Sequence, residues 1–536
     1  MKHLKRLLLA LVILSLAVGC QTVKKVEQVL RIAKDNDVSS LDTNVATDGL
    51  SFEVIKTFTE GLFEYDAAGV IVPGVATKYD VSADGKVYTF TLRKDAKWSN
   101  GDPVTASDFV FSWRRLCDPK LATEYSYMAS GIMIKNAADV ISGAKPLTDL
   151  GVKAIDANTL EVTLDAAVPY FIQLMTFPIF NPLNEKFVTA KGDAFAKSAD
   201  ALLSNGPWTV TEWTEGTKIR VEKNANYWNK SKINLAAIEF LIIKDYQTAA
   251  LEFENGNVDI AKISSDLVDR YKSKDYFVTN KLGYTWYVAP NFLDAKFKNE
   301  NLRLALALSF DKSYITDTIL HDGSNVADYI VPIGLATGPD GKDFRTGAAT
   351  FLSYNTAKAQ EYWTKAKADL GVTTLSLELL VDDAADTKAV SEFLQAEWQK
   401  NLPGLTITIQ TQPKKNRLAL MRAGTFQLGL TRWGPDYADP FTYLGDLFQT
   451  GVNYNYGRFS DPAYDALIQK TAPGGAQSTD AVARWATLHD AEKVLLDQAG
   501  IFPAWQSGEA MLINTKVTGY EFHVVGQPSY RNVVKK

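Results

Sequence analysis

The order of apolar patterns between residues 375 and 409 constrains the fold more than any other feature of the sequence. Residues 375–381 form an apolar strand pattern, residues 388–401 carry apolar side chains at helical spacing, and residues 405–409 alternate between apolar and polar side chains. A strand, a helix and a strand in this order predict a parallel crossover unit. The chain is therefore expected to belong to the α/β class.

A polar segment, TRWGPDYADP at residues 431–440, follows the next predicted strand. That strand is the alternating run at 426–430, which comes after a short helical pattern at 417–423 that Gly424 ends. In open α/β sheets, ligands bind in the crevice outside the carboxyl ends of the strands. The position of the polar segment therefore makes it a candidate site.

Two aspartates of this segment have different predicted roles. Gly434 and Pro435 predict a turn that presents Trp433 and Asp436. A carboxylate beside aromatic rings suits a cationic group, through a charge-assisted hydrogen bond and cation–π contacts; a solvated turn aspartate is the alternative. Asp439 lies before a proline and a helical pattern, a combination typical of a helix cap. The spacing of a Ca²⁺ loop is absent, while a glycosidase-type partner carboxylate elsewhere in the chain is left open.

The N-terminal half predicts further strands, and the length predicts more than one domain. Residues 88–92 and 160–164 alternate between apolar and polar side chains, so one face of each strand is expected to be buried. A chain of 536 residues exceeds the size at which a single hydrophobic core stops growing. Because no Pro- or Ser-rich linker divides the chain, about two or three domains are expected to meet through short crossovers.

The first twenty residues have the layout of a secretory leader. A basic start is followed by an apolar run at residues 7–18, and then by Gly19 and Cys20. The run is too short to span a membrane, which takes about 20 apolar residues. Its ending, AVGC, resembles a bacterial lipobox, which implies cleavage before Cys20 and acylation of the Cys20 thiol. The alternative is a simple secretory peptide with an ordinary cysteine.

Charge and residue counts exclude several classes of protein. The net charge is −5, and removal of Lys2, Lys5 and Arg6 with the leader takes it to about −8, which argues against a nucleic-acid partner. With Cys20 acylated, only Cys117 remains, so Cys117 is predicted to be a small core residue without a disulfide. The three histidines of the mature chain lack metal-ligand spacing, and the common hydrolase, P-loop and dinucleotide-binding motifs are absent. No metal, cofactor or catalytic residue is predicted.

Several segments spread over the mature chain carry a family resemblance. The most specific is the run KWSNGDPVTA at residues 97–106, followed by Asp108 and Phe109. The resembling segments lie at 40–66, 81–115, 204–228, 302–315 and 458–468. Together, and in collinear order, they resemble the peptide-binding branch of the family 5 solute-binding proteins, the extracytoplasmic receptors of oligopeptide ABC transporters.

The resemblance implies a two-lobe clamshell of the periplasmic-binding-protein type, with an additional inserted α+β lobe (cluster C). In this family the lobes close over an extended peptide, so that main-chain hydrogen bonds supply affinity and roomy, wet pockets accept many side chains. The expected divisions are a leader at 1–19, a discontinuous lobe I at 20–59, 179–281 and 501–536, an inserted lobe II at 60–178 and lobe III at 282–500.

The resemblance also assigns roles to single residues. Asp436 matches the aspartate that holds the α-ammonium group of the ligand. The other positions that match ligand contacts are Trp433 and Gly434 beside it, Thr47, Asp48 and Gly49 in an N-terminal loop, and Tyr125 in the inserted lobe.

Three positions depart from the enteric pattern of the family. Leu430 stands where an arginine would meet the carboxylate of the peptide, Thr387 stands in place of a histidine, and Lys414 replaces a tryptophan. These changes remove the familiar carboxylate clamp. Lys414, or its neighbour Lys415, is a candidate replacement cation; the alternative is that both lysines are solvated.

The function implied by the resemblance is that of a lipid-anchored receptor on the extracytoplasmic face of the cell membrane. It would bind peptides and deliver them to an ABC transporter permease, as a monomer and without a cofactor. Two alternatives are a receptor of the same fold for another solute, such as an oligosaccharide or a signalling peptide, and a surface hydrolase.

Overall fold

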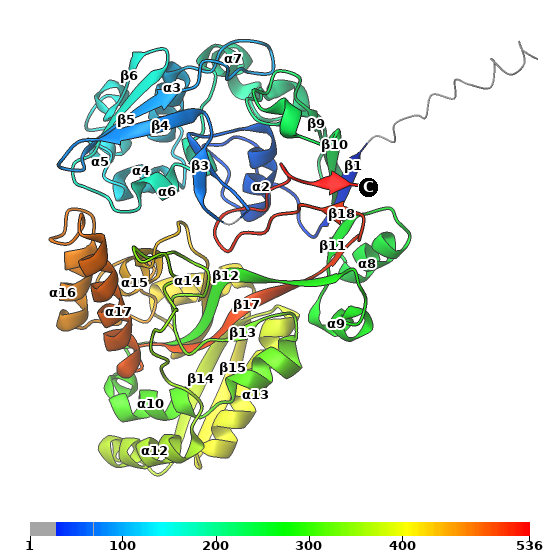
Figure 1. Cartoon of the computed structure of the whole chain (residues 1–536). Helices are drawn as coiled ribbons and strands as arrows, with labels where there is room; N and C mark the ends of the chain where they lie inside the picture. The colour runs from blue at the N-terminus through cyan, green and yellow to red at the C-terminus, as the bar shows by residue number, and fades with distance from the viewer. Residues whose placement is uncertain (1–27, 68) are drawn as a thin grey trace, which may run out of the picture.

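A computed structural model describes residues 28–67 and 69–536 (Figure 1). The predicted leader and Cys20 lie outside the described residues. Figure 1 shows two bodies, one containing the N-terminus of the described chain and one built mainly from the residues after 290.

One large mixed sheet runs through both bodies of the described chain. It has eleven strands in the order β15-β14-β16-β12-β17-β11-β1-β10-β9-β8, and β13 pairs with β17 outside this path. The long strands β12 and β17 pass between the two bodies (Figure 1). The strands are β1 Val29–Lys34, β8 Trp208–Thr214, β9 Lys218–Lys223, β10 Ala237–Ile242, β11 Ile260–Lys262, β12 Phe277–Pro290, β13 Asn325–Val326, β14 Leu375–Asp382, β15 Leu405–Gln412, β16 Leu428–Trp433 and β17 Phe502–Ile513.

The predicted strand–helix–strand unit is present and confirms the α/β class. Strands β14 and β15 pair in parallel, and helix α13 (Ala385–Asn401) connects them. Three apolar side chains of the predicted helical stripe, Val390, Leu394 and Trp398, are fully buried. Their burial at helical spacing is the reason that this segment forms a helix against the sheet.

Strand β16 differs in detail from its prediction. The alternating pattern placed it at 426–430, whereas the strand runs from Leu428 to Trp433. β16 lies between β14, to which it is parallel, and β12, to which it is antiparallel. Because both faces of a central strand are covered, its residues up to Thr431 are buried without alternation. The preceding helix, α14 (Lys414–Ala423), starts earlier than predicted and ends, as predicted, at Gly424, which has φ of 70°.

A separate four-stranded antiparallel sheet lies within the segment predicted to be the inserted lobe. Its strands alternate in burial as predicted: Tyr88, Phe90 and Leu92 of β5 are buried, and so are Leu160 and Val162 of β7. The sheet order is β4-β5-β7-β6, with β4 Ala76–Val81, β5 Val87–Leu92, β6 Val152–Asp156 and β7 Thr159–Thr163. The division of the whole chain into lobes stays a prediction.

Helices cover the sheets on both bodies. The free thiol of Cys117 is buried at the end of α3, as predicted.

No helix among the described residues is long and apolar enough to cross a membrane. The remaining α-helices are α2 Gly49–Phe58, α3 Ala106–Leu116, α4 Ser126–Gly131, α5 Ala137–Ile141, α6 Phe171–Leu174, α7 Glu185–Lys191, α8 Tyr246–Glu254, α9 Ser265–Tyr271, α10 Glu300–Leu308, α11 Lys312–Tyr314, α12 Thr356–Leu370, α15 Phe441–Phe448, α16 Pro462–Thr471 and α17 Ala481–Asp497. The shorter strands are β2 Phe63–Tyr65, β3 Ile71–Pro73, β18 Val517–Thr518 and β19 Val534–Lys535.

Candidate functional site

The turn after β16 is shaped by the residues packed around it. Trp433 is the last residue of the strand, and Gly434 and Pro435 leave it. A Cβ atom on Gly434 would lie 2.2 Å from Cε1 of Tyr284, so a larger residue there would displace the Tyr284 ring. The backbone N–H of Asp436 donates a hydrogen bond to Oγ1 of Thr442 on α15, at 3.3 Å. This packing turns the chain so that the Asp436 side chain leaves the sheet, as predicted.

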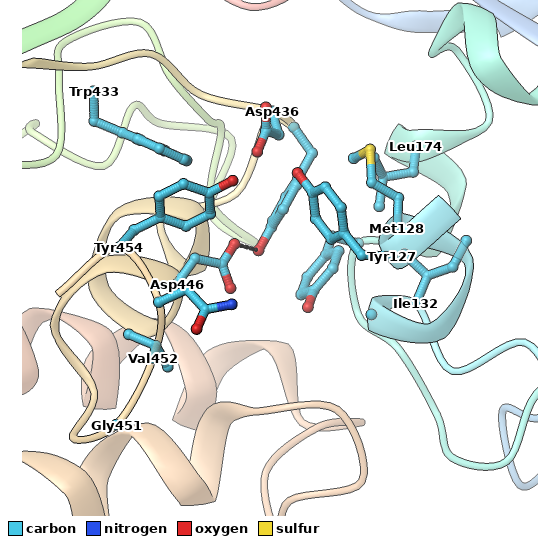
Figure 2. Close-up of a pocket in the computed structure, with 14 residues that line it drawn as sticks. Tyr127, Met128, Ile132, Leu174, Trp433, Asp436, Asp446, Gly451, Val452 and Tyr454 are labelled. Carbon is cyan, nitrogen blue, oxygen red and sulfur yellow. Dashed lines mark hydrogen bonds between the residues drawn. The ribbon is translucent and has the colours of Figure 1, made fainter. Parts of the chain in front are cut away.

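Asp436 and Trp433 line a cavity of about 330 Å³ between two distant parts of the sequence (Figure 2). One wall comes from α4 and α6, in the predicted inserted lobe, and contributes Tyr127, Met128 and Leu174. The facing wall comes from the β16 turn, from α15 and from the loop at residues 451–454. The cavity therefore lies where the two bodies of the molecule meet.

The Asp436 carboxylate has no hydrogen-bond or ion-pair partner within the described part of the chain. It is partly buried, and no hydrogen bond or ion pair to its carboxylate oxygens is present among the described residues. The loss of water around this carboxylate raises its pKa to about 7. A carboxylate of this kind can accept a cation from a ligand without breaking a bond within the protein.

A second carboxylate, Asp446, lines the same cavity. It lies on α15 and accepts a hydrogen bond of 2.7 Å from the hydroxyl of Tyr437. Burial, and then the nearby charge of Asp436, raise the pKa of Asp446 to about 7. We did not predict this residue from the sequence. The sequence does contain one indication of it: Asp446 is the single acid in a helical segment whose other side chains are mostly apolar, and in the structure these are buried.

Aromatic rings surround the two carboxylates. The Trp433 ring centroid lies 4.7 Å from that of Tyr454, and Tyr170 stacks on Tyr437 at 4.2 Å. Tyr127, which is 43% exposed, faces them across the cavity (Figure 2). The indole N–H of Trp433 is buried without a hydrogen-bond partner in the described chain. Rings in this arrangement suit a cation held close to their faces.

Asp439 has a structural role. Its Oδ1 atom accepts a hydrogen bond of 2.9 Å from the backbone N–H of Phe441, the first residue of α15, so Asp439 does lie at the start of the helix, but the predicted capping position is wrong by one residue. Pro440 occupies the capping position itself. The Asp439 carboxylate also forms a bidentate ion pair with Arg484 of α17, at 2.7 and 2.8 Å, which the sequence did not predict.

The N-terminal loop approaches Asp436 from another side. Asp48 caps α2, since its Oδ1 atom accepts a hydrogen bond of 2.9 Å from the backbone N–H of Ser51. Thr47 is exposed, and a Cβ atom on Gly49 would lie 3.7 Å from Nε2 of Gln527. Gln527 lines a smaller cavity of about 20 Å³ together with Asp436 and Tyr437. Ligand contact by this loop stays a prediction.

Tyr125 precedes α4 and lies near the main cavity without lining it. Its ring packs against those of Phe52 and Phe177, each at 5.7 Å between centroids. Burial raises the pKa of Tyr125, and the negative charge of Asp436 raises it further. Tyr127, two residues along the chain, lines the cavity instead.

Lys414 lies in a separate, positively charged cluster and does not line the Asp436 cavity. It is the first residue of α14, where the helix dipole disfavours a cation, and the residue as a whole is exposed although its ammonium end lies close to other protein groups. Burial lowers the pKa of the Lys414 ammonium, and the charges of Arg432 and Arg417 lower it further, against the opposing charge of Asp382. The Arg417 side chain is only 3% exposed, and its Nε–H has no hydrogen-bond partner in the described chain. We did not predict either arginine from the sequence.

Metal ligands are not grouped in the described part of the chain. No group of three or more His, Cys, Asp or Glu side chains there could hold a metal ion.

Comparison with known proteins places this geometry in a family. A family model described as "Bacterial extracellular solute-binding proteins, family 5 Middle" matches residues 70–455. The chain is 36% identical over 528 residues to the dipeptide-binding protein of Lactococcus lactis subsp. cremoris, covering 95% of this chain and 94% of that protein. The substrate-binding domain of an oligopeptide ABC transporter from Bacillus anthracis str. Ames has a TM-score of 0.78 and 39% identity, covering 95% of this chain and 99% of that chain. Listeria monocytogenes OppA, solved bound to peptide, has a TM-score of 0.77 and 36% identity with the same coverage. This likeness confirms the predicted fold class.

Proposed function

We propose that this chain, which belongs to family 5 of the bacterial extracellular solute-binding proteins, captures peptides and delivers them to the permease of an ABC transporter. The family binds solutes, so the prediction that the chain is not an enzyme is confirmed. Relatives named for dipeptide and oligopeptide binding cover nearly the whole chain, which supports peptides as the solute.

The observation that carries the proposal is the unpartnered carboxylate of Asp436. The α-ammonium group of a peptide can supply the missing cation, with a charge-assisted hydrogen bond to Asp436 and a cation–π contact with Trp433. The walls of the cavity come from both bodies of the molecule, so a bound peptide contacts both at once. Contacts of this kind favour a closed arrangement of the lobes over an open one.

The other end of the peptide has a proposed partner in the cationic cluster at Lys414. The charges of Arg417 and Arg432 lower the pKa of Lys414, and the nearby carboxylate of Asp382 already forms an ion pair with Arg417, at 3.6 Å between Nε and Oδ2. A peptide carboxylate would supply a second negative charge. The proposal assigns to Lys414 the role that an arginine at the position of Leu430 would otherwise have.

The proposed receptor acts outside the cytoplasmic membrane. The leader-like sequence and the Cys20 lipobox support export followed by lipid anchoring, although both lie outside the described residues. Relatives named as periplasmic support the same side of the membrane. Metabolic labelling with a fatty-acid analogue, with Cys20→Ser as the unlabelled control, tests the anchor.

The decisive experiment compares free-amine and N-acetylated forms of one peptide by isothermal titration calorimetry. Asp436→Asn should weaken binding of the free amine by about 30-fold or more, because losing one partner of a desolvated charge pair costs about 2 kcal/mol or more. Binding of the acetylated form should change little. Asp80→Asn, which removes an acid whose side chain is 71% exposed on β4, is the matched control. Equal losses for both peptide forms would place the ammonium elsewhere.

A further inference from the structure

We propose that Asp446 makes the cavity beside Asp436 a pocket for a basic first residue of the peptide, so that lysine or arginine at that position is preferred. The proposal rests on the proposed function, since it takes Asp436 as the partner of the α-ammonium group. It adds a second ion pair, between the charged side chain of the first peptide residue and the carboxylate of Asp446.

The charges that line the cavity are unbalanced. The two carboxylates of Asp436 and Asp446 lie on its wall, and none of the lining residues is a lysine, arginine or histidine (Figure 2). The hydroxyl of Tyr437 is the only group of the described chain that donates a hydrogen bond to Asp446, and it carries no positive charge. Buried or half-buried carboxylates are normally paired with a cation, because their desolvation is otherwise uncompensated.

The neighbouring Asp439 is a structural acid and differs from the two aspartates of the cavity in having a cationic partner. Asp439 is buried and has its own cation inside the protein, the guanidinium of Arg484, which binds it through two hydrogen bonds. Asp436 and Asp446 lie on either side of Asp439 in the sequence and have no such partner among the described residues. Both carboxylates therefore remain available to a ligand.

One α-ammonium group can neutralise only one of the two carboxylates. A lysine or arginine side chain on the same residue brings the second positive charge a few bonds away from the first. Its methylene groups can lie along the apolar wall of Met128, Ile132 and Leu174, while the charged end reaches Asp446. The cavity volume of about 330 Å³ is at the lower end of the range for ligand pockets, about 300–1,000 Å³, which suits one side chain.

A direct test uses two peptides that differ only in the first side chain, lysine in one and norleucine in the other, each followed by the same alanines. Norleucine has the aliphatic chain of lysine without its ammonium group. Calorimetry with the unmodified protein should give at least about tenfold tighter binding of the lysine peptide, as expected for a partly desolvated charge pair. Equal affinities would overturn the proposal, and this comparison requires no variant.

Asp446→Asn then assigns the preference to one residue. Asparagine keeps an oxygen that can accept the Tyr437 hydrogen bond, so thermal unfolding should change little. The variant should lose the preference for the lysine peptide and keep its affinity for the norleucine peptide. A preference that survives Asp446→Asn would overturn the proposal.

The proposed function and this inference fail in different ways. If neither peptide binds, the proposed function is wrong. If both peptides bind but N-acetylation has no effect, Asp436 does not hold the α-ammonium group, and this inference fails with that assignment. If the norleucine peptide binds and depends on its free amine but the lysine peptide gains nothing, only the role of Asp446 is wrong.

Discussion

Peptide affinity should rise with pH across the neutral range, because ligand binding requires the ionised form of Asp436. Burial raises the pKa of this carboxyl to about 7 from an ordinary value near 4. A bound ammonium group stabilises the carboxylate and lowers the pKa again. Below about pH 7, therefore, a proton must leave the site before the cation can bind.

The size of the effect follows from the fraction of protonated sites. About half of the Asp436 carboxyls carry a proton at about pH 7, and about nine in ten at about pH 6. Binding of a peptide with a neutral first residue should therefore weaken about fivefold from about pH 7 to about pH 6, a range in which the α-ammonium group of the peptide stays charged. For a peptide that begins with lysine, burial also raises the pKa of Asp446 to about 7, so the two carboxyls together extend the loss over the same range toward about thirtyfold.

The other titratable groups that line the cavity should not mask this dependence. They are Tyr127, Tyr170, Tyr437 and Tyr454, and burial raises the pKa of each above its ordinary value. These hydroxyls stay neutral over the whole range. The α-amino group of the peptide has an ordinary pKa of about 8 and loses its proton only above this range, so the change from about pH 6 to about pH 7 belongs to the two aspartates.

Calorimetry in two buffers of different ionisation enthalpy measures the protons released. At about pH 7 the neutral-first peptide should release about half a proton per peptide bound, and the lysine-first peptide about twice as many. The N-acetylated peptide and the Asp436→Asn variant serve as controls and should both lose the Asp436 contribution. An affinity for the free-amine peptide that is constant from about pH 6 to about pH 7 would refute the reasoning, because it would mean that no carboxyl titrates on binding.

Three further substitutions test other parts of the structure. Lys414→Ala should weaken a free-acid peptide by about 0.2–1 kcal/mol, the range for an exposed pair, and leave its C-amidated form unchanged in calorimetry; identical results for the two forms would exclude the replacement clamp. Arg484→Met should lower the free energy of unfolding in denaturant by about 3–5 kcal/mol, because it leaves the buried Asp439 without its cation, and adding Asp439→Asn should recover part of the loss. Gly434→Ala should lower the free energy of unfolding in denaturant by about 1–3 kcal/mol, since its Cβ meets the ring of Tyr284; an undiminished loss in a Tyr284→Ala background would contradict this cause.

The parts of the fold that were predictable are those determined by local periodicity. The helical spacing of Val390, Leu394 and Trp398 and the alternation around Phe90 identify their elements because burial imposes a period on the sequence. The bounds of β16 were not predictable in this way. Its neighbours β12 and β14 come from other segments and pair with both of its edges, which makes β16 a central strand. Its residues up to Thr431 are buried whichever face they point to, so the alternation that marks a half-exposed strand is absent.

The candidate site was predictable only in part, for a related reason. Asp436 and Trp433 were identifiable because they lie at the end of a strand pattern and match positions of the resembling family. Tyr127 and Asp446 reach the same cavity from segments that the sequence separates by more than three hundred residues. Their convergence depends on how the two bodies of the molecule meet, and a pattern read along one segment does not contain that information.

The presence or absence of a paired cation distinguishes the structural aspartate of this region from the two that line the cavity, whereas their positions in the sequence do not. Asp436, Asp439 and Asp446 lie within one short stretch, yet only Asp439 is paired with a cation of the described chain. An acid paired with a cation of the protein contributes to the free energy of folding. For a buried acid without such a cation, the loss of hydration raises the pKa, and a cation of a bound ligand can offset that loss. Arg484→Met should therefore reduce stability with little change in the preference between lysine and norleucine peptides. Asp446→Asn should do the reverse, and the same effect from both substitutions would mean that the cavity and the ion pair act as one unit.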